Sequence, residues 1–256
     1  MATTISIKTA EEIAIMREGG KVLAKCLNET AAIAKTAITK SGISTLDLDE
    51  FAEKFLLSHG GKPSFKGFSG YPATLCVCID EEVVHGIPRK EKILKEGDLV
   101  SIDCGFFYKG FHTDATVLIG IGEISKTKKK IISVAEETLA QAIDFIHDGI
   151  YLGDLSEVIE KNIKKNGYEV IDELTGHGIG RKLHEPPIVT NQREGSLPIL
   201  RSGMTIAIEP IFALGSGEIK TLRDNWTIVT ADKNISAQIE HTVLITDTGC
   251  EILTIE

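Results

Sequence analysis

The sequence predicts an α+β fold in which one curved, mostly antiparallel sheet carries helices on its outer face. Two segments with apolar residues at helical spacing are followed by short runs with strand-like alternation, and this order begins again near the middle of the chain. Matching residues return with it at a nearly constant spacing. A repeat of helix, helix and sheet would join two half-sheets about a pseudo-two-fold axis, with one cleft shared between them.

The first half opens with two predicted helices. Thr9 and Glu12 form a capping box, and apolar residues recur at helical spacing after them. A second helix is predicted to begin near Ser44 or Thr45 and to end at the glycine pair 60–61. β-Branched residues and alternation then predict strands at 73–79, 99–104 and 111–119.

The second half repeats this order. Apolar spacing predicts one helix from about 127 to 147 and another from about 154 to 166. Strand-like stretches follow at 205–209, 226–229 and 239–246.

Three glycines recur in register between the halves. The offset is 106 or 107 residues for the pairs Gly42 and Gly149, Gly60 and Gly167, and Gly97 and Gly203. A carboxylate lies six residues after the third recurring glycine of each half: Asp103 after Gly97, and Glu209 after Gly203. No Pro- or Ser-rich linker divides the chain near its midpoint, so we expect residues 1–256 to form a single domain with an internal duplication.

Composition and charge exclude several classes of protein. A net charge of −9 and a single basic run at 128–130 argue against a nucleic-acid partner, which needs clustered Lys and Arg. No uncharged apolar run approaches the ~20 residues of a membrane span, so we expect no membrane insertion. The five cysteines lack disulfide-framework spacing, and we therefore expect a cytoplasmic protein. A zinc pair at Cys76 and Cys78 is an alternative to buried thiols.

Carboxylates that end strands are the first candidates for chemistry. Asp103 and Glu209 are expected to meet near the pseudo-axis, because each follows the repeated glycine. The hairpin after Asp103 is predicted to turn at Tyr108 and Lys109, which would put Asp103 directly opposite Asp114. A turn one residue later would make the two acids diagonal neighbours on the same face. Like charges this close favour a divalent cation, and a solvated hairpin end is the alternative.

The seven histidines differ in their surroundings. His177 lies in Gly-His-Gly-Ile-Gly, where a flexible backbone can bring an imidazole close to a ligand. His85 and His184 each precede a proline-stiffened loop, and His112 shares strand parity with Asp114, so it rivals His177 as a metal ligand on spacing alone. Two others have the setting of helix-ending residues: His59 and His147.

Short motifs that contain these residues follow one another over almost the whole chain. They are His85-Gly-Ile-Pro, Ile102-Asp103, His112-Thr-Asp114, Gly176-His177-Gly-Ile-Gly180, His184-Glu185-x-Pro187, Ile208-Glu209-Pro210 and Glu240-His241-Thr242. This ordered set resembles the methionine aminopeptidases, in their bacterial, type I form. The resemblance implies the pseudo-symmetric pita-bread fold, which agrees with the duplication.

The resemblance also implies a ligand set for two divalent metal ions. One ion would be bound by Asp114, His177, Glu209 and Glu240, and the other by Asp103, Asp114 and Glu240. His112 is then not a ligand. Such ligands hold two ions ~3.5–4 Å apart around a bridging water or hydroxide that attacks the peptide. Co, Mn, Fe and Zn all tolerate this mixture of ligands.

Further residues acquire roles from the same resemblance. Glu209 would act as general base, His184 would stabilise the oxyanion, and His85 would assist at the scissile amide. Both histidines would contact the substrate. The pocket for the methionine side chain would be lined by Phe65, Phe68, Tyr71, Cys76, Leu183 and Trp226.

Some positions depart from the family. Phe68 and Leu183 stand where a Tyr and a larger aromatic are usual, so we expect a roomier pocket. Cys78 and Asp80 stand where Ser and Asn are common, which puts a monovalent-ion site formed there in doubt.

The resemblance implies a metal-dependent aminopeptidase that removes an N-terminal methionine when the next residue is small. Its partners would be the N-termini of nascent polypeptides, at the ribosome or away from it, and it would act as a monomer. One alternative is an X-Pro aminopeptidase or dipeptidase of the same fold, although those enzymes usually carry a large extra N-terminal domain. The other is a non-catalytic relative that binds protein or RNA, whose usual sign is the loss of metal ligands.

Overall fold

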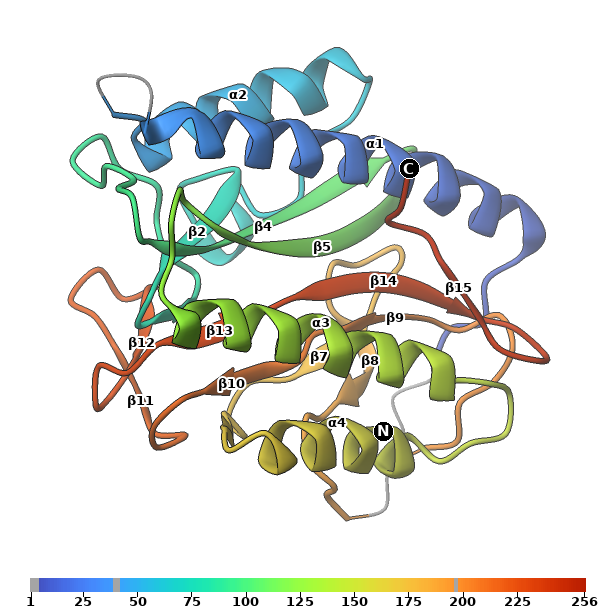
Figure 1. Ribbon diagram of the computed structural model, residues 1–256. Coiled ribbons are helices and arrows are strands. Elements are labelled where there is room, and N and C mark those ends of the chain that lie inside the picture. The colour runs from blue at the N-terminus through green and yellow to red at the C-terminus, as the bar shows by residue number, and fades with distance from the viewer. Residues whose placement is uncertain (1–4, 39–41, 196–197) are drawn as a thin grey trace.

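The computed structural model describes residues 5–38, 42–195 and 198–256 (Figure 1). The helices are α1 (Ala10–Lys35), α2 (Thr45–Ser58), α3 (Lys126–Phe145) and α4 (Leu152–Lys165), with single 3-10 turns at Thr36–Ile38 and Phe68–Gly70. The strands are β1 (Lys62–Pro63), β2 (Leu75–Ile79), β3 (Glu82–Val84), β4 (Leu99–Tyr108), β5 (Phe111–Gly120), β6 (Glu169–Val170), β7 (Gly176–Gly178), β8 (Glu185–Val189), β9 (Thr205–Ile208), β10 (Ile211–Ala213), β11 (Ile219–Thr221), β12 (Ile228–Thr230), β13 (Ser236–Gln238), β14 (Glu240–Ile245) and β15 (Cys250–Ile252). No described helix is both long and apolar enough to cross a bilayer.

Side-chain caps set the starts of the helices. The hydroxyl of Thr9 accepts the N–H of Glu12 at 3.3 Å, and the Glu12 carboxylate accepts the N–H of Thr9 at 2.9 Å, which completes the predicted capping box. Ser44 and Asp47 form a second box at α2. The predicted helix boundaries agree with the observed ones to within about two residues.

Nine strands form one antiparallel sheet, which lies inside the layer of helices. Its path is β1-β4-β5-β14-β9-β7-β8, with β2 beside β4 and β15 beside β14. Helices α1 and α2 pack on the half that contains β4 and β5, whereas α3 and α4 pack on the half that contains β9 and β14 (Figure 1). The remaining strands form two small sheets, β13-β10-β6 and β11-β12-β3. The predicted α+β fold, with a curved antiparallel sheet and outer helices, is confirmed.

The β4–β5 hairpin corrects one detail of the prediction. Asp103 pairs with Thr116, and Asp114 pairs with Gly105, so the two acids are diagonal neighbours instead of directly opposed residues. The turn lies at Lys109 and Gly110, one residue later than expected. Their φ angles of +46° and +94° are those of a two-residue turn that matches the twist of a hairpin, and glycine favours this geometry.

Candidate metal centre and its cavity

Five side chains converge from neighbouring strands of the large sheet. In the order of the strands β4, β5, β14, β9 and β7 they are Asp103, Asp114, Glu240, Glu209 and His177, with Glu209 directly after β9. We call these five residues the ligand cluster. Since β5 and β14 are neighbours, the strand pairing itself brings acids from distant parts of the chain together.

The ligand cluster is compact and buried. One ligand atom each from Asp114, His177 and Glu240 lies within 4.8 Å of the others, and Nε2 of His177 lies 3.8 Å from Oε1 of Glu209. None of the four acids is more than 8 % exposed. Within the described residues, Asp114, His177 and Glu240 are the only group of three or more potential ligands with this spacing, so nothing there supports a zinc site at the two cysteines of β2.

Several carboxylate oxygens of the ligand cluster lack hydrogen-bond partners. Oδ1 of Asp103, Oδ1 of Asp114 and Oε1 of Glu240 are buried and unpaired in the described part of the chain. The second oxygen of Glu240 is fixed, because Oγ1 of Thr116 donates to it at 3.0 Å. Buried carboxylate oxygens without partners are costly, and divalent cations are the groups that satisfy such oxygens.

Burial changes the protonation of every member of the ligand cluster. It raises the pKa of Asp103 to about 7. Burial, together with repulsion from the other acids, raises the pKa values of Asp114, Glu209 and Glu240 well above their usual range. Burial and the nearby His184 lower the pKa of His177 to about 3, which leaves this imidazole neutral. Four acids that resist ionisation beside a neutral imidazole therefore fit divalent metal ions as the missing positive charge.

The orientation of His177 suits it to metal binding. Its Nδ1 lies 2.9 Å from the carbonyl oxygen of Gly178, so Nδ1 carries the proton and donates it. The lone pair of Nε2 is then directed toward the acids. A backbone partner that fixes the tautomer in this way is typical of metal-bound histidines.

Two more histidines lie beside the ligand cluster. The ring of His184 meets that of His177 edge-on, with 4.3 Å between ring centroids. His85 follows β3 with a φ of +57°, an uncommon conformation for a residue with a side chain. Burial lowers the pKa of both His85 and His184, so both rings are neutral near pH 7.

Three other histidines considered from the sequence, His112, His59 and His147, lie outside the ligand cluster. Nδ1 of His112 lies 2.8 Å from the hydroxyl of Ser64, and the group of ligand atoms found among the described residues does not include His112. His59 is the C-cap of α2, and His147 lies just beyond α3.

A cavity of about 920 Å³ adjoins the ligand cluster. Every residue that the sequence predicted for the site lines this cavity. One wall is apolar and belongs to a single packed cluster, whose members at the cavity are Phe65, Tyr71, Cys76, Leu183 and Trp226. Phe68 is 43 % exposed and packs edge-on against His184 at 5.2 Å between ring centroids.

The sequence pattern of metallopeptidase family M24 matches residues 14–247. The chain belongs to this family. The methionine aminopeptidases of Clostridium perfringens and Bacillus subtilis are 44 % and 41 % identical to it, and each alignment covers 98 % of this chain and 99 % of the relative.

Solved structures show the same relation. The methionine aminopeptidase of Thermotoga maritima matches this metallopeptidase with a TM-score of 0.94 and 42 % identity over 99 % of this chain and 100 % of the other. An Xaa-Pro dipeptidase from Bacillus anthracis matches with a TM-score of 0.78 and 25 % identity, over 98 % of this chain but 62 % of the other. The predicted enzyme class, pita-bread fold and resemblance to methionine aminopeptidases are confirmed.

Three polar residues that the sequence did not single out for the site hold acids of the ligand cluster by hydrogen bonds: Thr116, Gln238 and Thr242. Nε2 of Gln238 donates to Oε2 of Glu209 at 3.2 Å. The hydroxyl of Thr242 accepts the N–H of Asp114 at 2.9 Å and donates to its carbonyl oxygen at 2.7 Å. Each of the three lies two residues from a predicted ligand on the same strand or next to it, so strand alternation was the signal that could have found them.

Proposed function

We propose that this chain is a metal-dependent aminopeptidase that removes the N-terminal methionine from polypeptides when the next residue is small. The observation that carries the proposal is a ligand cluster of four acids and one imidazole in a cavity whose adjoining wall is apolar. The full-length similarity to methionine aminopeptidases supports methionine as the residue removed.

The ligand cluster would hold two divalent ions. One would be bound by Asp114, His177, Glu209 and Glu240, and the other by Asp103, Asp114 and Glu240. The unpaired buried oxygens and the lone pair of His177 support this assignment. Bound there, the ions would polarise the scissile carbonyl and lower the pKa of water toward neutrality. Co, Mn, Fe and Zn all suit these donors.

Glu209 would move protons during hydrolysis. Gln238 holds Oε2 of Glu209 by a hydrogen bond, which leaves Oε1 on the side of His177. Bound to a metal ion, Glu209 would be ionised, and its carboxylate could then accept a proton from the attacking water and pass it to the leaving amine.

His184 and His85 would act as neutral hydrogen-bond donors. Burial lowers the pKa of each ring, so an N–H remains available without a positive charge. We infer that His184 donates to the oxygen on which charge develops and that His85 donates at the scissile amide. Donors already held in position stabilise such charge without reorganising during the reaction.

The apolar wall would take the methionine side chain. Burial raises the pKa of the Cys76 thiol well above its usual range, so this group remains neutral against an apolar ligand. Tyr71 and Trp226 pack edge-on at 5.1 Å between ring centroids and form part of this wall. A flexible thioether packs well against such rings and sulfur.

The substitution His177→Ala tests the metal centre. It removes the only nitrogen ligand, so we expect at least a 10³-fold loss of activity on Met-Ala-Ser and a lower content of bound metal, with an unchanged circular dichroism spectrum. His59→Ala is the matched control, because His59 is exposed at the end of α2. Full activity of His177→Ala would refute the assignment.

Substrate comparison tests the specificity. Met-Ala-Ser should be cleaved much faster than Met-Leu-Ser, and an X-Pro peptide should be left intact. Equal cleavage of the two methionyl peptides would contradict the preference for a small second residue. Preferential cleavage of the X-Pro peptide would replace the proposed activity with that of the dipeptidase relatives.

We infer further that the enzyme acts as a cytoplasmic monomer on the N-termini of newly made polypeptides. All five cysteines are free thiols, which suits a reducing compartment. Size-exclusion chromatography with light scattering tests the monomer against the chain mass of 27.8 kDa.

A further inference from the structure

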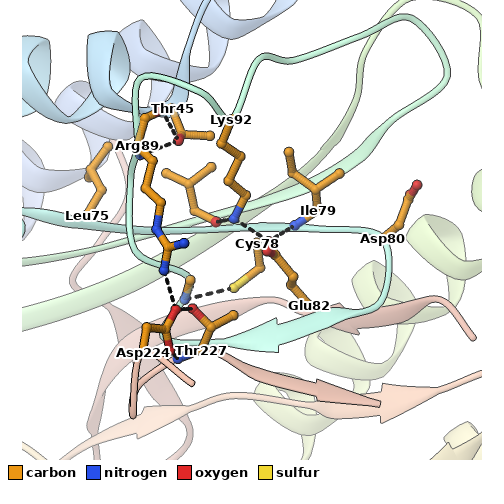
Figure 2. A network of polar contacts seen from close by, with 12 residues as sticks. Thr45, Leu75, Cys78, Ile79, Asp80, Glu82, Arg89, Lys92, Asp224 and Thr227 are labelled. Atoms are coloured by element: carbon orange, nitrogen blue, oxygen red, sulfur yellow. Dashed lines mark hydrogen bonds and ion pairs between the residues drawn. The ribbon is translucent and has the colours of Figure 1, made fainter. Parts of the chain in front are cut away.

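We propose that the ion pair between Arg89 and Asp224 positions Trp226 against His85, which makes Arg89 a positioning residue for the methionine pocket. Neither Arg89 nor Asp224 lines the cavity. The pair joins two loops that are far apart in the sequence (Figure 2). Each loop carries one cavity residue, His85 or Trp226. The assignment of the pocket to methionine rests on the proposed function, whereas the contacts that hold Trp226 do not.

The loop that carries His85 and Arg89 is fixed to the elements beneath it. The N–H of Arg89 donates to the hydroxyl of Thr45 at 2.8 Å, at the first residue of α2. The N–H of Gly86 donates to the sulfur of Cys78 at 3.4 Å. Lys92 donates from Nζ to a carbonyl oxygen of β2 at 2.7 Å (Figure 2). The guanidinium of Arg89 therefore extends from an anchored backbone.

Asp224 organises the loop that carries Trp226. Its Oδ1 accepts the N–H of Trp226 at 3.0 Å and that of Thr227 at 2.9 Å. Its Oδ2 accepts the Thr227 hydroxyl at 2.7 Å and also the guanidinium of Arg89 (Figure 2). One carboxylate thus holds the backbone of the tryptophan and receives the arginine, so a movement of Asp224 moves the tryptophan with it.

Trp226 lies between one attachment to the His85 loop and one to β3, the strand that precedes this loop. Upstream is the ion pair at Asp224, and downstream the strand pairing of Ile228 with Val84. The indole packs edge-on against His85, with 6.2 Å between ring centroids, and contributes to the apolar wall. Without the ion pair, the strand pairing would be the backbone attachment that remains between Trp226 and the β3 side, so the ring would be held less firmly against His85.

The expected size of the effect follows from exposure. The side chain of Arg89 is 49 % exposed and that of Asp224 is 15 % exposed. Exposed ion pairs are weak, so Arg89→Ala should raise KM for a methionyl peptide by roughly two- to fivefold and leave kcat within about twofold. Loss of a group that acts on bound substrate would instead lower kcat.

Intrinsic tryptophan fluorescence tests the position of Trp226 directly and needs no added label, because Trp226 is the only tryptophan. Arg89→Ala should shift the emission to longer wavelength and increase quenching by acrylamide, since the indole gains contact with water. Arg89→Lys should restore part of the difference. Arg193→Ala is the matched control, because Arg193 makes exposed ion pairs with Asp154 and Glu157 in another part of the molecule.

Asp224→Asn separates charge from shape, because the amide oxygen can still accept the backbone N–H groups. We expect it to weaken the ion pair between residues 89 and 224 as Arg89→Ala does, and we expect the double variant to be no worse than either single one. Additive effects, or emission equal to the parent in Arg89→Ala, would overturn the proposal. A changed emission without a change in KM would overturn the role in the pocket and leave the proposed function standing. Should methionyl peptides not be cleaved at all, the proposed function fails, and the fluorescence still decides whether Arg89 holds Trp226.

Discussion

Thr116 lies between acids of the ligand cluster that come from different strands. It pairs with Asp103 of β4 on one side and with Glu240 of β14 on the other. Its hydroxyl donates to Glu240 at 3.0 Å, and its side chain is buried. A donor in this position fixes one carboxylate oxygen and leaves the other for a cation.

We therefore expect Thr116→Val to weaken metal binding without unfolding the protein. The substitution keeps the shape of the side chain and removes the hydrogen bond to Glu240. Loss of such a supporting hydrogen bond typically lowers metal affinity about 10- to 100-fold. Titration of the metal-free variant with Mn²⁺, followed by calorimetry or recovered activity, measures the change.

Thr113→Val is the control from the same strand. The hydroxyl of Thr113 is buried and has no hydrogen-bond partner among the described residues. Its replacement by a methyl group removes an unsatisfied polar atom, so stability should stay the same or rise. Equal metal affinity in the two variants would show that the hydroxyl of Thr116 does not support the ligands.

The acids of the ligand cluster were easier to identify from the sequence than the histidine that lies beside them. Asp103 stood out because it follows a repeated glycine and because the predicted hairpin brings it close to Asp114, where two like charges call for a cation. The choice between His177 and His112 was different, because both have a suitable local setting. It depends on β7 lying next to β9, a contact that no local pattern encodes.

The segment that precedes α1 is attached to β8 by a buried ion pair. Nζ of Lys8 lies 2.9 Å from Oε2 of Glu185, and the two side chains are 3 % and 10 % exposed. The N–H of Lys8 also donates to the carbonyl oxygen of Gly203 at 2.8 Å. A Cβ at Gly180 would lie 2.5 Å from Cε of Lys8, so a larger residue there would displace the end of the lysine side chain. Since Glu185 follows His184, this attachment also holds a cavity residue.

Lys8→Met should destabilise the protein by roughly 3 kcal/mol or more. The substitution keeps the apolar stem but leaves the carboxylate of Glu185 buried without its counter-charge, and breaking a buried pair in this way is costly. Lys25→Met is the control, because Lys25 forms an exposed pair with Glu29 at 4.0 Å and should change stability by less than about 0.5 kcal/mol. Urea unfolding measures both, and a similar small loss in the two variants would contradict the role of Lys8.

Helices with capping signals in the sequence were predicted well. Short strands that exist only because they pair with a neighbouring strand were not predicted. Capping boxes located the starts of α1 and α2 because the signal lies within four residues. The strands β6, β10 and β11 have two or three residues each and were not predicted, since so short a strand exists only through its ladder partner. The Lys8–Glu185 pair spans 177 residues and leaves no local trace.

At the scale of the whole molecule, we propose that the chain is one domain built from two duplicated halves. The glycines that recur in the sequence share a positive φ, which other residues rarely adopt: Gly42 and Gly149 (+97° and +90°), Gly60 and Gly167 (+80° and +84°), and Gly97 and Gly203 (+95° and +86°). A backbone hydrogen bond recurs as well. Leu94 donates to Ile43 at 2.9 Å in the first half. Leu200 donates to Ile150 at 2.8 Å in the second.

The two halves together enlarge an electrostatic problem, because each half contributes two of the four acids. Strands from both bring their acids into one buried cluster, where burial raises the pKa of Asp103 to about 7 and raises the pKa values of Asp114, Glu209 and Glu240. Without metal ions, the folded protein relieves the repulsion by keeping protons on these acids. With metal ions, the acids must lose those protons to bind.

Stability of the metal-free protein should therefore fall as pH rises from 7 to 8. The folded-state pKa values lie above the unfolded ones, so the folded state binds more protons, and the stability that these protons provide is lost as the pH passes the folded pKa values. The loss is on the order of 1 kcal/mol per pH unit for each acid still protonated. His177 does not interfere, because its pKa of about 3 and the unfolded value near 6.5 both lie below this window.

Urea unfolding in EDTA at the two pH values measures the trend. Saturating Mn²⁺ should reverse it, since ions bind the ionised acids and only in the folded state. If the metal-free protein instead becomes more stable from pH 7 to 8, the acids of the ligand cluster are already ionised without a cation. Their repulsion would then no longer argue for two metal ions.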